Sequence, residues 1–250
     1  MHRVGTDPKQ AIEMAQLIAA QSWLQLDGIF THLATADVVN HEATARQVHE
    51  FDRVCDELKL SGLLPSRIHI ANSSATMNHM GNADQMKHAP TMTRVGVAMY
   101  GIAADAQSNS FGVATGVALQ PVMSLKARVS HVQWLDAGEA VSYGLHRVLK
   151  QRSCIATLPI GYADGVPRGL WETGEVLIGG KRRAFAGIVT MDQVMINCEN
   201  DDVQIGDEAV LIGNQGANQI TANDWARQLG TIGYEIVCGI SARVPRSYLR

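Results

Sequence analysis

The sequence predicts an α/β segment followed by a mostly antiparallel β domain. In the first part, short apolar runs that end in small polar residues alternate with amphipathic runs, which is typical of a parallel α/β barrel or a doubly wound sheet. After the polar stretch Ser108-Asn109-Ser110, short strand-like runs are separated by Gly and Asp turns. Only about three strand–helix units precede that stretch, whereas a closed barrel has eight, so the first segment is expected to be incomplete.

Helix-start signals and apolar periodicity define the elements of the first segment. Thr6-Asp7-Pro8 is a helix-start signal, and apolar side chains at helical spacing mark one long helix. The expected elements are a helix over Lys9–Ala20, a strand over Leu26–Asp37, a helix over Glu42–Leu60, a strand over Arg67–Ser74 and a short helix over Ala75–Met80.

The last expected strand of this segment, Thr93–Gly101, carries one charge, Arg94, among apolar residues. A guanidinium stays charged and has only donors, so a buried one needs a carboxylate, a phosphate or the lone pair of a ligand. A structural salt bridge is the simpler explanation. Gly96 favours a ligand, because glycine lets backbone N–H groups come close to an anion.

The β domain is expected to combine short strands with one capped helix. Thr221-Ala222-Asn223-Asp224 is an N-cap signal for a helix over Trp225–Leu229, and Tyr234–Val244 is a final apolar run. The expected strands are Val122–Trp134, Ser153–Pro159, Glu175–Ile178, Arg183–Thr190, Met195–Cys198 and Glu208–Ile212.

The composition is that of a globular protein with a sizeable core, because 46% of the residues are hydrophobic and 18% are charged. The net charge of -3, without a basic or acidic run, indicates neither nucleic acid nor a membrane surface as a partner. The cysteines are far apart and mostly in apolar runs, so neither a metal site nor disulfides are expected. Without a spanning apolar run or a secretory signal, a cytoplasmic protein is expected.

Several polar residues at strand ends or beside glycines are candidates for chemistry, and each also has an ordinary structural explanation. His32 at a strand end is more often structural than catalytic, and Ser73 could cap the helix that follows it. Tyr143 and Tyr162 each stand beside a glycine and would ordinarily be amphipathic turn residues. No hydrolase triad, Walker loop or HExxH motif occurs in the sequence.

Taken together, several short segments resemble bacterial alanine racemases, in the order in which that family carries them. They are Met1–Gly5, Phe30-Thr31-His32 with Ala36-Asp37, Ala71-Asn72-Ser73, Arg94-Val95-Gly96, Val141–Gly144, Pro159–Gly165, Met191-Asp192-Gln193, and Tyr234-Glu235 with Cys238–Ser241.

The resemblance implies the C-terminal part of a TIM-type (β/α)8 barrel over residues 1–113 and a mostly antiparallel β domain over residues 114–250. It also implies a pyridoxal-5'-phosphate (PLP) enzyme that interconverts L- and D-alanine by two-base proton transfer and supplies D-alanine for peptidoglycan. Such enzymes work as homodimers with shared active sites. A racemase of broader specificity, acting on serine or other small amino acids, stays open as an alternative.

The resemblance assigns cofactor-binding roles to residues of both segments. Arg94 matches the arginine that faces the cofactor's ring nitrogen, where similarly built decarboxylases carry an acidic residue. A permanent cation cannot accept that nitrogen's proton, so the ring is a weaker electron sink. Ser73, the backbone at Gly96 and Val97, and Tyr234 match the residues that hold the cofactor phosphate.

Substrate and proton-transfer roles are implied in the same way. Arg3 and the main chain at Met191 match the groups that hold the substrate carboxylate, and Tyr162 and Asp192 match residues at the substrate entrance. Tyr143 matches the catalytic tyrosine, which in the family serves the site of the other subunit, opposite a lysine.

A tyrosine can act as a base near neutral pH only if neighbouring groups favour the phenolate, because a free phenol has a pKa of about 10. His32 and Arg94 match the neighbours that favour the phenolate in this family and complete the expected catalytic group with Tyr143. Thr190 departs from the pattern, since many relatives carry a cysteine there, and we attach no functional change to it.

The start of the chain departs from the family more strongly. Met1 matches an internal methionine of the family's Asp-Thr-Gly-Met motif, so we expect an N-terminal truncation that removes the Schiff-base lysine. An inactive remnant, at most a dimerising or PLP-phosphate-binding module, therefore stays open beside the racemase. None of the lysines of this chain lies in a segment that resembles the family's lysine motif; they are Lys9, Lys59, Lys87, Lys126, Lys150 and Lys181.

Overall fold

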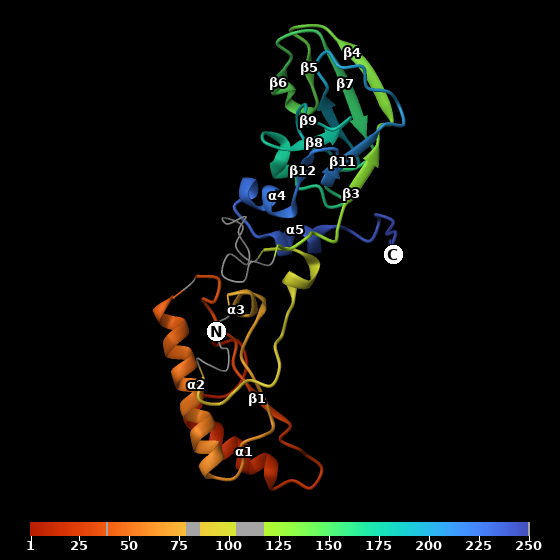
Figure 1. The fold of residues 1–250 in the computed structure, drawn as a ribbon. Helices are drawn as coiled ribbons and strands as arrows, with labels where there is room; N and C mark the ends of the chain where they lie inside the picture. Colours follow the sequence, from red (N-terminus) through yellow and green to blue (C-terminus); the bar gives the residue numbers. More distant parts are fainter. Residues whose placement is uncertain (39, 79–85, 104–117, 250) are drawn as a thin grey trace. The chain divides into compact units, whose positions relative to one another are not determined.

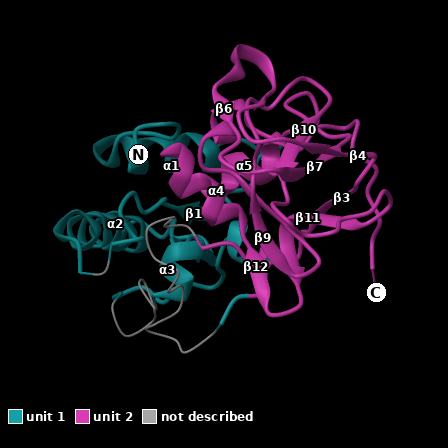
Figure 2. Ribbon diagram, turned by 90° about the horizontal axis from the view of Figure 1, so that it is seen from above, with its two compact units in different colours: residues 1–99, 110–119 teal, residues 100–109, 120–250 magenta. Residues whose placement is uncertain are grey.

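The computed structural model describes residues 1–38, 40–78, 86–103 and 118–249 (Figure 1). The chain divides into two compact units, residues 1–99 with 110–119 and residues 100–109 with 120–250 (Figure 2). The expected domain boundary between residues 113 and 114 and the polar stretch 108–110 lie outside the described residues, so that boundary stays a prediction. Within the described ranges, no helix is long and apolar enough to cross a membrane.

The first unit is an α/β unit built on two parallel strands. Strands β1 and β2 pair in parallel, with Phe30 opposite His69 in the register. The chain between them forms α2, the kind of helical crossover that a parallel pair requires. The elements are a 3-10 turn (Pro8–Gln10) capped by Asp7, α1 (Ala11–Ala19), β1 (Gly28–Phe30), α2 (Glu42–Leu60), β2 (Arg67–His69) and α3 (Ser73–Met77).

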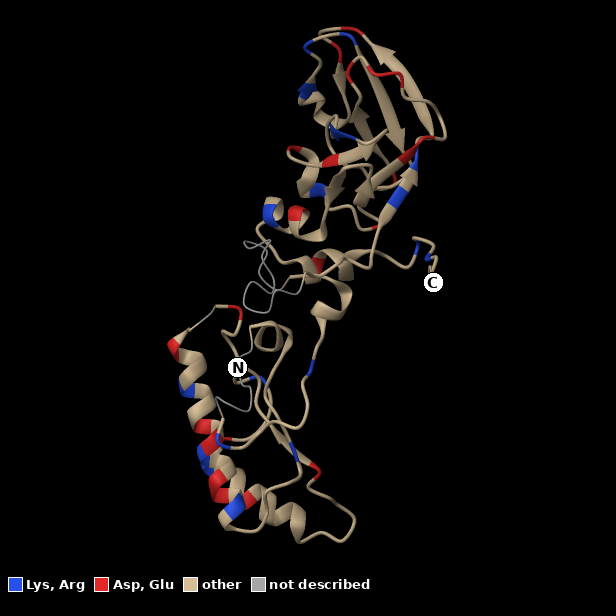
Figure 3. Ribbon diagram, viewed as in Figure 1, with Lys and Arg blue, Asp and Glu red and all other residues tan. Residues whose placement is uncertain are grey.

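Helix α2 begins and ends where the apolar periodicity predicts. Its buried face includes Phe51, Val54, Cys55 and Leu58, and Phe51 and Cys55 join a core cluster with residues of both strand ends. Acidic and basic residues are interspersed along the helix (Figure 3), and Arg53 forms a partly exposed ion pair with Glu50. Exposed pairs of this kind contribute little to stability, so the apolar face determines the helix position.

The prediction of a strand over Thr93–Gly101 is wrong. Residues 93–96 belong to no strand, and a 3-10 helix, Val97–Tyr100, follows them. Single hydrogen bonds hold this segment to the end of β2, from the Arg94 amide to the Ala71 carbonyl (2.9 Å) and from the Thr91 amide to the Ile68 carbonyl (2.8 Å). The apolar run is explained by the burial of Val97 in the 3-10 helix and not by hydrogen-bonded pairing with a neighbouring strand. Arg94 is only half-buried.

Both strands of the first unit are shorter than the sequence predicts. Within the expected strand over Leu26–Asp37, only Gly28–Phe30 forms a strand, β1. The expected strand over Arg67–Ser74 ends at His69. The short helix starts earlier than expected because the Asn72 side chain accepts a hydrogen bond from the Ala75 amide (3.0 Å) and caps α3 there. The expected helix end, Met80, lies outside the described residues.

The second unit is a mostly antiparallel β domain, so the predicted fold class of α/β followed by antiparallel β is confirmed. One sheet has the order β10-β7-β4 and a larger one the order β12-β11-β8-β9, with β3 also paired to β11, while β5 and β6 form a separate pair. The strands are β3 (Leu125–Arg128), β4 (His131–Leu135), β5 (Ala140–Val141), β6 (Arg147–Val148), β7 (Ser153–Leu158), β8 (Glu175–Ile178), β9 (Lys181–Ala184), β10 (Val194–Asn197), β11 (Glu208–Gln215) and β12 (Asn218–Ile220).

Irregular backbone explains where the predicted β elements fail. The expected strand over Arg183–Thr190 ends at Ala184, and a glycine at position 187 with a φ of +110° lies in the irregular segment that follows. The pattern did not predict β5, β6 and β12, which have two or three residues each. The final apolar run forms a helix, α5 (Gly233–Gly239).

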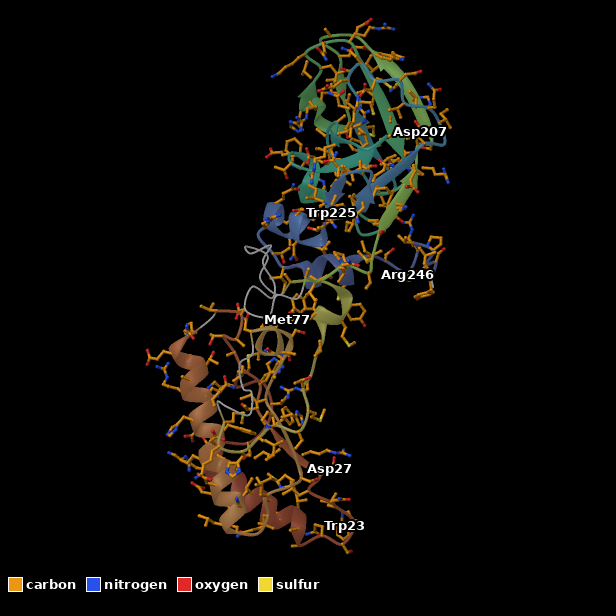
Figure 4. All side chains as sticks on the ribbon, viewed as in Figure 1. Trp23, Asp27, Met77, Asp207, Trp225 and Arg246 are labelled. Carbon is orange, nitrogen blue, oxygen red and sulfur yellow. The ribbon has the colours of Figure 1, made fainter. Side chains whose placement is uncertain are left out.

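Helix α4 (Ala222–Leu229) bears out the N-cap signal and anchors the core of this unit. Thr221 and Asp224 form a capping box, and Gly230 ends the helix in a left-handed conformation. Trp225 in α4 (Figure 4) is buried in one apolar cluster with Phe185 and Leu211. Burial of these large side chains provides the main stabilisation of the unit.

We expect Leu211→Ala to lower the free energy of unfolding of the β unit by about 2–5 kcal/mol, because it leaves a cavity under a fully buried strand residue. The measurement is urea unfolding followed by tryptophan fluorescence. Ile205→Ala is the matched control, since that side chain is exposed and its truncation should change stability by less than about 0.5 kcal/mol. Equal losses in the two variants would contradict this assignment of the core.

Candidate active site

The guanidinium of Arg94 lies among groups from the ends of the two parallel strands. Its Nη1 lies 2.6 Å from Nδ1 of His69, and its Nη2 donates to the main-chain oxygen of Thr31 at 2.8 Å. Nη2 also lies 3.3 Å from Nδ1 of His32 and 3.3 Å from the Ile70 oxygen. Because β1 and β2 are parallel, the residues that follow them meet at one sheet edge, where the segment at Arg94 crosses.

All of these partners of Arg94 are neutral acceptors. In the described part of the chain Arg94 forms no ion pair with a carboxylate, so the structural salt bridge considered from sequence is not found there. The Phe30 ring lies 5.2 Å from the guanidinium carbon and stacks on the His69 ring. Burial lowers the pKa of Arg94, but the group stays charged at any working pH.

Arg94 acts on both neighbouring histidines. A guanidinium only donates, so Nδ1 of His69 must accept from Nη1, and the neutral His69 ring keeps its proton on Nε2. Burial lowers the pKa of His32 below its ordinary 6.5, and the charges of Arg94 and Arg3 lower it further. Burial and then the charge of Arg94 also lower the pKa of His69.

Ser73 connects the end of β2 to the segment after Arg94. Its Oγ accepts hydrogen bonds from the backbone amides of Gly96 (2.8 Å) and Ala98 (3.4 Å), and the side chain is buried. The hydroxyl still has its own proton to donate. The expected phosphate-binding residues Ser73, Gly96 and Val97 therefore lie together. Asn72 caps α3, so Ser73 is not the helix cap.

In the second unit, two turns that carry expected substrate residues are joined by backbone hydrogen bonds. The Tyr162 amide donates to the Thr190 oxygen (2.9 Å), and the Ala163 amide donates to the Met191 oxygen (3.0 Å). Gly161 makes this approach possible, because an added Cβ would lie 2.2 Å from the Thr190 oxygen. Tyr162 and Met191 are both exposed at these turns.

Arg243 ties the same two turns together from the C-terminal segment. Its Nη2 donates to an Asp192 carboxylate oxygen at 2.7 Å, and its Nε lies 3.4 Å from the carboxylate of Asp164, which is buried. Asp164 also accepts from the Gly161 amide at 2.9 Å. The position of Asp192 is thus fixed through a bridging cation that the sequence reasoning did not identify.

The remaining expected residues of this unit are Tyr143 and Tyr234. Tyr143 lies in the loop between β5 and β6 with 74% of its surface exposed. Tyr234 lies in the first turn of α5 and is half-buried. The expected residues therefore fall into two groups. Arg3, His32, Ser73, Arg94, Gly96 and Val97 belong to the first unit, and Tyr143, Tyr162, Met191, Asp192 and Tyr234 belong to the second.

His69 is a site residue that the sequence reasoning missed, and Asn72 was named there only as a candidate beside Ser73. His69 receives the shortest Arg94 contact, and Asn72 donates to the Leu33 oxygen at 3.1 Å with the same Nδ2 atom that lies 3.4 Å from Nε2 of His32. Both residues lie at or shortly after the carboxyl end of β2, which the sequence could not locate because the strand was expected to continue to Ser74.

Comparison with known proteins agrees with this two-part description. Residues 1–104 match the family model for the alanine racemase N-terminal domain, and residues 122–248 match the model for the C-terminal domain. The alanine racemase of Symbiobacterium thermophilum is 42% identical over 99% of this chain, and that of Halothermothrix orenii is 40% identical over 99%. The chain spans 63% of the length of each of these curated relatives.

Solved structures give the same result. The alanine racemase from E. faecalis superposes with a TM-score of 0.87 at 34% identity, covering 100% of this chain and 63% of that one. The alanine racemase from Bacillus anthracis with bound L-Ala-P superposes with a TM-score of 0.86 at 36% identity, covering 100% of this chain and 62% of that one.

The fold, the family models and the solved structures thus place the chain in the class of proteins in which an α/β segment precedes an antiparallel β domain. Within that class, the chain belongs to the alanine racemase family.

We expect Arg94→Gln to raise the pKa of both His32 and His69 toward 6.5 without fully restoring it, because burial is the larger cause of both shifts. Since the folded pKa values are depressed, the unfolded state takes up protons first as the pH falls through 6.5. The unfolding free energy of the first unit should therefore decrease below that pH, and less steeply in the variant. NMR titration of the histidine rings measures both values, with Arg128→Gln in the other unit as control; unchanged pKa values in Arg94→Gln would contradict the cluster.

Proposed function

We propose that this protein acts in a PLP-dependent alanine racemase that interconverts L- and D-alanine. The observation that carries the proposal is the charged Arg94 guanidinium, which has neutral acceptors around it. Arg94 lies two residues before Gly96, whose amide donates a hydrogen bond to Ser73. The names of two related structures support it, since one alanine racemase has bound L-Ala-P and another is a complex with cycloserine. We place the reaction in the cytoplasm as a source of D-alanine for peptidoglycan.

The residues of the first unit fit the cofactor. Arg94 offers N–H donors and accepts nothing, which suits an unprotonated pyridine nitrogen and excludes a protonated one. The buried Ser73 hydroxyl has a proton to donate, and its oxygen accepts from the backbone amides of the Gly96 segment, so hydroxyl and amide donors lie together in a way that suits a phosphate. In this assignment Ser73, Gly96, Val97 and Tyr234 hold the phosphate, and Arg94 faces the ring.

When bound, PLP supplies an electron sink that stabilises negative charge at the amino-acid Cα. The chain's own residues supply orientation and proton transfer. Arg3 and the main chain of Met191 hold the substrate carboxylate, while Tyr162 and Asp192 control its entrance. The Tyr143 phenolate takes the proton from Cα in one direction, and the resulting hydroxyl gives a proton to Cα in the other; neutral His32 with the Arg94 charge favours the phenolate form.

A shared-site homodimer is part of the proposal. A ring as exposed as that of Tyr143 has the freedom to enter the site of a second copy, as the family resemblance implies. Racemisation also needs a base on the opposite face of Cα, a lysine in this family, and none of the lysines in this chain matches that motif. We therefore assign the second base to the portion of the relatives that this chain does not cover.

The test joins this chain to the portion of the Symbiobacterium thermophilum enzyme that it does not cover and measures D-alanine formation. We expect PLP binding and racemisation, and Tyr143→Phe should lower kcat about 10²–10⁴-fold, because one general base is removed. Tyr248→Phe, which alters another exposed phenol, is the control.

Rates with L-serine separate an alanine racemase from one of broader specificity. PLP binding without racemisation would favour a binding module, and an undiminished rate in Tyr143→Phe would refute the assignment of the base.

A further inference from the structure

We propose that Ser142 is a positioning residue that fixes the Tyr143 phenol relative to the Met191-Asp192 turn, through a strained backbone and a hydroxyl bond to Ile188. This inference rests on the proposed function, because it concerns the geometry of the same proton transfer. All of the residues that carry it belong to the second unit.

The backbone around Tyr143 is unusual for residues with side chains. Ser142 has φ 69° and ψ −178°, a combination that is essentially restricted to glycine. Gly144 follows with φ 73° and Leu145 with φ 50°, so Tyr143 is flanked by left-handed backbone on both sides. Strained residues of this kind persist only where the surroundings fix them, and they are concentrated at functional sites.

The surroundings of Ser142 do fix it. Its Oγ donates to the Ile188 oxygen at 2.8 Å, and the preceding Val141 pairs with Arg147 across β5 and β6. Gly187 packs against the same two residues: an added Cβ there would lie 2.7 Å from the Val141 oxygen and 2.8 Å from Ser142 Cβ. The two segments therefore touch without room for a further atom.

The far side of the Tyr143 loop is held as well. Arg147 donates from Nη2 to the Glu172 oxygen at 3.1 Å, and the His146 ring lies 5.6 Å from that of Trp171. The Tyr143 ring itself is exposed, so packing cannot orient it within the described structure. Hydrogen bonds and close contacts fix the backbone from which the ring extends, and Ser142 is the flanking residue whose side chain fixes that backbone to another segment.

The identity of the residue strengthens this inference. Glycine would adopt the conformation at position 142 without strain, whereas serine adds only a Cβ and a hydroxyl. The hydroxyl binds the Ile188 carbonyl, three residues before Met191, whose own carbonyl accepts from the Ala163 amide. Ser142 thus connects the proton-transferring residue to the group that holds the substrate carboxylate.

The experiment compares Ser142→Ala, which keeps the strain and loses the bond, with Ser142→Gly, which loses both. In the joined enzyme described above we expect each to lower kcat about 10–100-fold with KM for alanine nearly unchanged, because a small misplacement of a base is costly in rate. Ser142→Gly should melt at a temperature at least as high as Ser142→Ala. Ser130→Ala, which loses a similar hydroxyl bond to the Thr157 oxygen (3.0 Å), should keep full activity.

Three outcomes would overturn the inference while leaving the proposed function intact. The first is a kcat restored to the parental value in Ser142→Gly, which would show that relief of strain alone matters. The second is additivity of Ser142→Gly with Tyr143→Phe, since a residue that acts through Tyr143 should add nothing once the phenol is gone.

The third outcome is read without activity, so the inference is tested even if racemisation fails. The NMR order parameter of the Tyr143 amide should fall from about 0.85 to below about 0.6 in Ser142→Ala. An unchanged order parameter would refute the positioning role.

Discussion

The central constraint in this protein is a half-buried guanidinium that meets no carboxylate among the described residues. Arg94 instead contacts ring nitrogens and main-chain oxygens from the ends of β1 and β2. Because every contact among the described residues is with a neutral acceptor, the positive charge is not cancelled there, and it adds to the effect of burial in lowering the pKa of both nearby imidazoles. The parallel register of the strands and the segment at Ser73 and Gly96 all serve to hold this one group in place.

The second unit is organised by close backbone contact rather than by charge. Gly161 and Gly187 occupy positions where any side chain would collide with a neighbouring main chain, so the turns at Tyr143, Tyr162 and Met191 form one connected surface. Arg243 adds an ionic bridge at its edge, but that bridge is solvent-exposed and contributes little energy by itself. The rigidity comes from turns seated on a well-packed β core.

Sequence reasoning succeeded where one local pattern determines the element. The apolar face of α2 and the N-cap of α4 are specified by neighbouring residues, and both were predicted. It failed at Thr93–Gly101, because a short apolar run does not distinguish a strand from a buried 3-10 turn. His69 was missed because its role depends on the register between strands whose residues are about 40 positions apart, which no local pattern encodes. The roles of the predicted site residues came from family resemblance, not from periodicity.

The two units therefore preorganise two different quantities. Around Arg94, what is fixed is an electrostatic field, and small displacements of the side chain change it gradually because Coulomb energy varies slowly with distance. Around Tyr143, what is fixed is the path of the backbone, and in the proposed reaction proton transfer is much more sensitive to the placement of the reacting atoms. The first unit holds one cation by several hydrogen bonds, whereas the Tyr143 loop uses left-handed backbone and direct contact. A tyrosine that acts as the proposed base from an exposed ring needs the stiffer kind of support.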